Sequence, residues 1–314
     1  MFTPTAVFAD AFGKHLAGLY DRAYSRREAR YGEMICEAAR LVFERISLSD
    51  ALYHDAEHTA LVTLVGQDIL RGLRLKRDVS PEDWLHFTLA TLTHDLGYIR
   101  GVCRGDRNGA YVIGAEGGVV SLERGASDAS LAPYHIERSK LAVRERFGSH
   151  PIINAERIAR AIELTRFPVP DDDDHRETDT EAGLVRAADL IGQLADPLYP
   201  RKLNALFHEF EEIGCNAKLG YTCPGDIADH YPRFFWTKVE PFIGDALAYL
   251  ALTCEGRLWS SSLFANIFEM EHALRTIGPE GEHRNIAGPV AKFWRLPCVE
   301  DAGGMCASDF GGGA

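Results

Sequence analysis

Five histidine and aspartate residues fall at spacings that suit a metal centre. His54 and His58 are four residues apart, so both side chains can lie on one side of a helix start. His94 and Asp95 are adjacent at the end of an apolar segment, and Asp189 stands among apolar residues much later in the chain. Imidazole and carboxylate ligands suit zinc, iron or manganese, and magnesium where histidines are fewer. Because a carboxylate in an apolar environment needs a cation, we predict that His58, His94, Asp95 and Asp189 bind a divalent metal ion.

Each of these residues has an ordinary alternative when it is considered alone. A single histidine on a helix is more often a packing or surface residue than a metal ligand, and the same holds for a single aspartate. The ordered combination carries the prediction, since every member falls at an expected helix end or on an apolar helix face.

The order His, then His-Asp, then a distant Asp resembles the HD superfamily of metal-dependent phosphohydrolases. Within it, the chain is most similar to the catalytic domain of cyclic nucleotide phosphodiesterases over about residues 51–250. The family pattern Tyr-His-Asn-x-x-His is similar to residues 53–58, with Asp55 in place of Asn. Residues 137–143 resemble the segment Glu-Asn-His-His-Leu-Ala-Val but keep only its acid, Glu137, and lack both histidines.

The resemblance implies a role for each matching residue. It makes His58, His94, Asp95 and Asp189 the ligands of a first metal ion, with Asp95 bridging to a second ion held mainly by water. It makes His54 the general acid that protonates the leaving oxygen, aligned by a nearby acid. Glu137 would order water at the metal. The implied activity is hydrolysis of a phosphoester by water that one or two divalent ions (Zn, Mn, Mg or Fe) activate.

Two departures from the phosphodiesterase pattern bear on the substrate. After His-Asp, that family continues with a further histidine and an asparagine, whereas this chain continues Leu-Gly-Tyr. The purine-selecting glutamine would fall at Val239 if Phe242 is the family's clamping phenylalanine. We therefore predict a metal-dependent phosphohydrolase for a small phosphoester, either a nucleotide or a cyclic-nucleotide-like phosphodiester, without assigning a purine.

Two other functions compete with this prediction. An HD-type mixed-valent diiron oxygenase needs two additional histidines between Asp95 and Asp189, and His135 and His150 lie in that interval. His135 is also a candidate ligand of a second metal ion. A binding module that keeps a structural metal is the other alternative, but such a scaffold has little need of His54.

Several side chains are candidates for contact with the substrate. Arg100, Arg104 and Arg107 lie on the glycine-rich segment that follows Asp95, and arginine offers a fork that fits phosphate. Phe242 is a candidate pocket wall. The alternative role of the arginines is to keep an exposed loop soluble.

The elements that must position these residues are predicted to be helices. Apolar periodicity and capping residues indicate an all-α fold, an HD-domain helical bundle with a glycine-rich insertion at 97–130 that contains a small hairpin. The expected helices are 26–47, 56–73, 80–97, 135–147, 151–165, 179–195, 199–213, 231–252 and 258–276. We divide the chain into an N-terminal helical extension (1–50), a catalytic domain (51–296) and a flexible tail (297–314).

Composition limits the compartment and the partners. The 314 residues carry a net charge of −12, which disfavours duplex nucleic acid as a partner. We find no apolar run of the length that a membrane helix needs and no secretory signal, so we expect no membrane partner. Seven cysteines without a CxxC pair argue against a thiolate zinc site and favour the cytoplasm. The N-terminal extension is expected to pack on the main domain or to form a homodimer contact.

Overall fold

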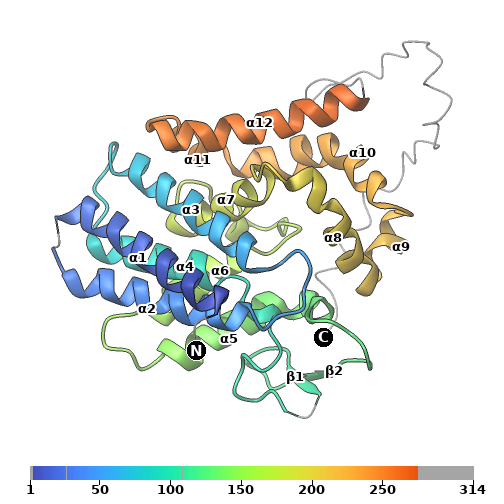
Figure 1. The fold of residues 1–314 in the computed structure, drawn as a ribbon, viewed down its shortest axis with the longest axis horizontal. Coiled ribbons are helices and arrows are strands. Elements are labelled where there is room, and N and C mark those ends of the chain that lie inside the picture. The colour runs from blue at the N-terminus through green and yellow to red at the C-terminus, as the bar shows by residue number, and fades with distance from the viewer. Residues whose placement is uncertain (1–2, 26, 108, 275–314) are drawn as a thin grey trace.

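The computed structural model describes residues 3–25, 27–107 and 109–274, and most of these are helical, as Figure 1 shows. The prediction of an all-α fold is therefore confirmed. The predicted tail, 297–314, lies outside the described residues. The α-helices are α1 (Pro4–Tyr24), α2 (Ala29–Ile46), α3 (Ala56–Leu73), α4 (Pro81–Thr93), α5 (His135–Phe147), α6 (Ala155–Leu164), α7 (Glu181–Leu194), α8 (Tyr199–Glu212), α9 (Cys215–Leu219), α10 (Pro224–Phe234), α11 (Gly244–Leu250) and α12 (Cys254–Leu274).

Shorter elements connect these helices. The turns of 3₁₀ helix are η1 (Leu96–Tyr98), η2 (Asp128–Tyr134), η3 (Asp173–His175) and η5 (Glu240–Phe242), and η4 (Phe235–Val239) is a π-helical turn. The glycine-rich insertion contains the predicted hairpin, in which β1 (Ala110–Val112) pairs antiparallel with β2 (Val119–Ser121). Tyr111 lies opposite Val120 in this hairpin, which projects from one end of the helical body (Figure 1).

Local sequence signals determine where several helices begin. Ser80 caps α4 by accepting a hydrogen bond from the backbone of Asp83, whose side chain bonds back to the Ser80 backbone, and Pro81 opens the first turn.

The single helix predicted over 231–252 is wrong. The chain there passes from α10 through η4 and η5 to α11, and Pro241 in η5 has no N–H to donate to a regular helical ladder. Helix α9 was not predicted, and glycines with positive φ, Gly214 and Gly220, bound it.

The N-terminal helices α1 and α2 pack on each other, and α2 packs on α4. The predicted apolar stripe of α2 supplies Ile35, Val42 and Ile46 to the core. The Tyr24 hydroxyl donates to the Val79 carbonyl at 2.6 Å and ties the end of α1 to the start of α4. These contacts join the first helices to the same core as the site helices.

Helix α3 runs through the centre of the molecule and packs along α7. Gly192 of α7 lies so close to α3 that an added Cβ would be 2.7 Å from Val62 Cα. Gly66 of α3 similarly faces Phe87 of α4, at 2.9 Å for an added Cβ. Since Gly192 is three residues after Asp189 and Val62 is four residues after His58, this close crossing brings those two side chains together.

Gly192→Ala is expected to lower the free energy of unfolding by about 1–3 kcal/mol, because the backbone of α3 cannot yield as a flexible side chain would. Chemical denaturation with the metal removed measures the effect. Gly244→Ala is the matched control, since no heavy atom lies within 4 Å of its added Cβ. The control should be neutral or slightly stabilising, and equal losses in the two variants would contradict this account of the crossing.

Candidate metal centre

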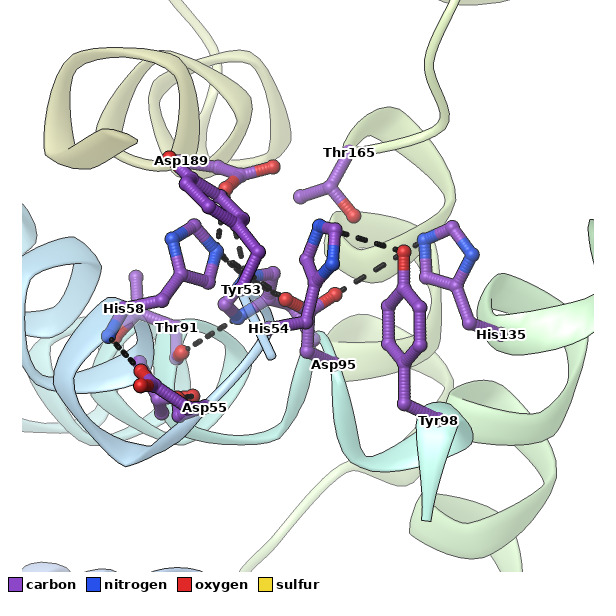
Figure 2. Close-up of polar contacts among 12 residues, drawn as sticks. Tyr53, His54, Asp55, His58, Thr91, Asp95, Tyr98, His135, Thr165 and Asp189 are labelled. Carbon is purple, nitrogen blue, oxygen red and sulfur yellow. Dashed lines mark hydrogen bonds and ion pairs between the residues drawn. The ribbon is translucent and has the colours of Figure 1, made fainter. Parts of the chain in front are cut away.

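Two helices and the end of a third position the predicted metal ligands. Asp55 caps α3 by accepting hydrogen bonds from the backbone N–H groups of Glu57 at 2.9 Å and His58 at 3.0 Å. This cap fixes the first turn of α3, from which His58 projects. His94 and Asp95 directly follow the last residue of α4, and Asp189 comes from α7 (Figure 2).

The donor atoms of these residues converge on one point. His58 Nε2 and His94 Nε2 are 3.4 Å apart, and each lies 3.2 Å from Asp95 Oδ2. Asp189 Oδ1 lies 3.4 Å from His58 Nε2 and 3.5 Å from His94 Nε2. Neighbouring ligands of one cation, at bond lengths of about 2.0–2.2 Å, are separated by roughly 3–3.5 Å. The spacing of His58, His94 and Asp95 therefore fits a single divalent ion, and Asp189 Oδ1 faces the same two imidazole nitrogens.

Burial and hydrogen bonding also fit a cation. His58, His94 and Asp95 are buried, and Asp95 Oδ2 has no hydrogen-bond partner among the residues that the structure describes. The Thr91 carbonyl accepts a hydrogen bond from His94 Nδ1 at 2.9 Å, which leaves the lone pair of Nε2 directed at the centre. A carboxylate oxygen without a hydrogen-bond partner and the imidazole nitrogens that face it together form the kind of donor set that binds a metal ion.

The pKa shifts of His58 and Asp189 show that the cluster favours positive charge. Burial lowers the pKa of His58, but contacts with Asp189 and Asp95 outweigh burial and raise this pKa to about 9. Burial raises the pKa of Asp189, but the His94 charge and the two imidazole contacts lower it to about 2. Protons therefore compete with a metal ion for the imidazoles, and the carboxylates remain ionised.

His54 lies beside the cluster in a separate pair with Glu209 of α8. His54 Nδ1 is 2.6 Å from Glu209 Oε2, and because a carboxylate only accepts, Nδ1 carries the hydrogen. Glu209 Oε1 accepts from the backbone N–H groups of Tyr53 at 2.6 Å and His54 at 3.3 Å. Burial lowers the pKa of His54, but the charge and hydrogen bond of Glu209 raise it overall. The Nε2 atom of a protonated His54 lies on the side of the ring away from Glu209, where it can donate to a bound molecule.

Tyr98 and His135 complete this side of the site. The Tyr98 ring stacks on His54 at 4.3 Å between ring centroids and on His135 at 4.6 Å, and Figure 2 shows the three rings side by side. The Tyr98 hydroxyl lies 3.4 Å from His54 Nε2. The Ala132 carbonyl accepts from His135 Nδ1 at 2.5 Å, so the Nε2 lone pair faces Asp95 Oδ1 at 3.9 Å.

The other predicted site residues are engaged elsewhere. Glu137 does not contact the cluster, because its carboxylate accepts from Lys140 at 2.8 Å and Arg166 at 2.5 Å. Phe242 packs against Arg186, whose guanidinium carbon lies 4.4 Å from the ring centroid. Val239, the position expected for a purine-selecting glutamine, is fully buried.

The predicted phosphate-binding arginines are held by ion pairs and backbone groups of the protein. Arg100 pairs with Asp128 and with Asp50 at 2.6 Å, and Arg104 donates to the Glu145 carbonyl at 2.7 Å. Arg107 pairs through its backbone with Ala110 at the base of the hairpin. In this conformation, neither Arg100 nor Arg104 directs its side chain into the metal cluster.

Glu209 and Tyr98 are site residues that sequence reasoning did not identify by name. Glu209 lies in the run His-Glu-Phe-Glu-Glu of α8, where nothing in the sequence separates it from its exposed neighbour Glu212. The folded chain buries Glu209 against the backbone of Tyr53 and His54, which is a contact across more than 150 residues. For Tyr98, the signal in the sequence is that Leu-Gly-Tyr follows His-Asp, where the phosphodiesterase family continues with a histidine and an asparagine.

The comparisons with known proteins identify a family. The family model described as Npun_R2479-like matches residues 2–273. The chain belongs to this family. No curated protein and no solved structure matches the chain. None of the helices in the described part of the chain is long and apolar enough to span a membrane.

Proposed function

We propose that the protein is a metal-dependent phosphohydrolase that hydrolyses a small phosphoester. The observation that carries the proposal is the juxtaposition of two groups. The donor atoms of His58, His94 and Asp95 are spaced for a divalent cation, and Asp189 faces the two imidazoles. Next to this cluster, His54 is held through Nδ1 by a buried carboxylate. The first group supports activation of water at a phosphorus atom, and the second supports protonation of the leaving oxygen.

The four ligands would hold the ion through His58 Nε2, His94 Nε2, Asp95 Oδ2 and Asp189 Oδ1. A divalent ion in this position supplies a Lewis acid for the phosphoryl oxygens and lowers the pKa of water from 15.7 towards about 7. The ionised carboxylates orient the imidazoles and balance the charge of the ion. The carbonyl of Thr91 keeps His94 in the tautomer that presents Nε2 to the ion.

His54 is the proposed general acid. Glu209 holds the Nδ1 edge of the ring with the hydrogen at Nδ1 and favours the protonated imidazole, so that the Nε2 hydrogen is available to the leaving alkoxide. The negative charge of Glu209 itself is stabilised by His54 and by two backbone N–H groups, so it stays ionised as a partner. This is the same division of roles that the resemblance to phosphodiesterases implies.

Asp95 and His135 support a second cation on the other side of the aspartate. Asp95 Oδ1 and His135 Nε2 are two electron-pair donors 3.9 Å apart, and burial lowers the pKa of His135, which favours the neutral ring. A diiron oxygenase would need a further histidine there. His150 instead accepts hydrogen bonds from the backbone of Ile152 and Ile153 beyond the end of α5. We therefore propose hydrolysis and not oxygenation.

Metal analysis combined with a panel of phosphoesters tests the proposed function. We expect one or two Zn, Mn, Mg or Fe ions per chain and release of phosphate or phosphomonoester from bis(p-nitrophenyl) phosphate, p-nitrophenyl phosphate, nucleotides or cyclic nucleotides. The net charge of −12 predicts little activity on long polyanions. Two irons per chain with oxygen consumption and no phosphoester cleavage would overturn the proposal.

Removal of the metal is expected to destabilise the fold as well as to stop turnover. An ion present at about 100 times its dissociation constant stabilises the native state by about 2.7 kcal/mol. We therefore expect a chelator to lower Tm by several degrees and re-addition of the ion to restore it. An unchanged Tm and unchanged activity after verified removal of the metal would contradict the assignment of the cluster.

A further inference from the structure

We infer that Tyr98 is a positioning residue that sets the orientation of His54. We also infer that Arg138 of α5, paired with Asp106 of the glycine-rich insertion, holds Tyr98 in place. This inference rests on the proposed function, because it takes His54 as the group that must be oriented. It assigns a role to the insertion and to a buried ion pair that the metal cluster and the Glu209 contact do not use.

The Tyr98 ring fills the space between two histidines. It is buried, and its plane lies within 13° of the His54 ring and 28° of the His135 ring. Glu209 fixes only the Nδ1 edge of His54, so rotation about that hydrogen bond is stopped by the face of Tyr98. The stack thus determines where Nε2 points, and it separates His54 from His135 (Figure 2).

Arg138 fixes the backbone on both sides of Tyr98. Its Nε donates to the Gly97 carbonyl at 2.7 Å and one terminal nitrogen donates to the Ile99 carbonyl at 2.9 Å. The guanidinium is fully buried, and its remaining hydrogens go to both carboxylate oxygens of Asp106 and to the Val112 carbonyl of β1. All five donors of Arg138 are therefore used in one arrangement.

Two further contacts restrict the same turn. The backbone N–H of Gly97 donates to the Ser139 hydroxyl at 2.7 Å, and an added Cβ at Gly97 would lie 1.8 Å from the His135 carbonyl oxygen. Asp106 also accepts from the backbone N–H groups of Gly101, Cys103 and Val112. The insertion and α5 are thus joined through one ion pair, and Tyr98 projects from the turn that this pair holds.

Variants of Tyr98 separate the stack from the hydroxyl. Tyr98→Leu is expected to lower kcat by about 10–100-fold, with KM and metal content little changed, because misorientation of a reacting group has effects of that size. Tyr98→Phe keeps the stack and loses only a long contact to Nε2, so we expect a loss of no more than about threefold. Tyr20→Leu removes a buried tyrosine of α1 and serves as the control for lost stability.

A double-mutant cycle tests whether Arg138 acts through Tyr98. Lysine cannot reproduce the planar fork, so Arg138→Lys should lower kcat, and the double variant with Tyr98→Leu should be no slower than Tyr98→Leu alone. Additive losses would overturn the link. If Arg138→Lys does not fold, Asp106→Asn weakens the same pair and enters the cycle in its place.

A readout that needs no activity keeps this inference separate from the proposed function. Ring currents of Tyr98 shift the imidazole C–H resonances of His54 and His135, which ¹³C-histidine NMR resolves with single His→Gln variants for assignment. We expect Tyr98→Leu and Arg138→Lys to move both sets of resonances and Tyr20→Leu to leave them in place. Unmoved resonances in the Arg138→Lys variant would overturn the inference. An inactive parent chain with the expected shifts would overturn only the proposed phosphohydrolase function.

Discussion

Asp95→Ala is expected to remove the bound metal ion and to lower turnover by roughly a thousandfold or more. Asp95 Oδ2 lies 3.2 Å from both imidazole Nε2 atoms, so its loss removes the carboxylate oxygen between His58 and His94 and leaves Asp189 Oδ1 facing them. Without the ion, water near pH 7 is a poor nucleophile, because its pKa returns towards 15.7. The measurement is metal content per chain by elemental analysis together with kcat on bis(p-nitrophenyl) phosphate.

A matched buried aspartate provides the control for this variant. Asp226 is buried at the start of α10, where its side chain accepts from the backbone N–H groups of Thr222 at 2.6 Å and Cys223 at 3.0 Å. Asp226→Ala should cost about 1 kcal/mol of stability through the lost cap while metal content and kcat remain at the level of the parent chain. Full metal content and activity in Asp95→Ala would refute the metal centre proposed here.

The features predicted correctly from the sequence are those that neighbouring residues determine. The bounds predicted for α3 and α5 match the structure, and α4 begins at the Ser80 cap, because caps and apolar periodicity act within one or two turns of a helix. The order of His58, His94 and Asp189 along the chain suggested that they lie together, and it is the packing of α3, α4 and α7 that brings them together. The identity of the bound ion and the proposed activity stay predictions.

The features that were not predicted depend on contacts between distant segments. Arg100 has the sequence context of a phosphate-binding residue, yet Asp128 and Asp50 neutralise it from segments 28 and 50 residues away. Glu209 lies 155 residues from His54, and only burial distinguishes it from the other acids of α8. The packing of α8 and of the glycine-rich insertion determines which acidic and basic residues form pairs, and local sequence patterns do not reveal these pairs.

His54→Ala is expected to lower kcat by about 10²–10⁴-fold while metal content stays at the level of the parent chain. The reason is that His54 contributes no donor atom to the cluster and instead presents Nε2, with Nδ1 held by Glu209, to the leaving oxygen. The loss should depend on the leaving group, since an alkoxide must be protonated as it departs and a nitrophenolate departs without help. We therefore compare kcat for bis(p-nitrophenyl) phosphate and for an alkyl phosphodiester.

Glu209→Gln sharpens this test, because it keeps the size of the side chain and removes the charge that favours protonated His54. We expect a smaller loss of kcat than in His54→Ala, with the same bias towards the alkyl substrate, and a double variant no slower than His54→Ala alone, since Glu209 acts through the imidazole. Loss of the metal in His54→Ala would instead make His54 a ligand. Equal losses on both leaving groups would mean that His54 orients the substrate and does not donate the proton. The comparison of leaving groups therefore decides whether His54 is the general acid.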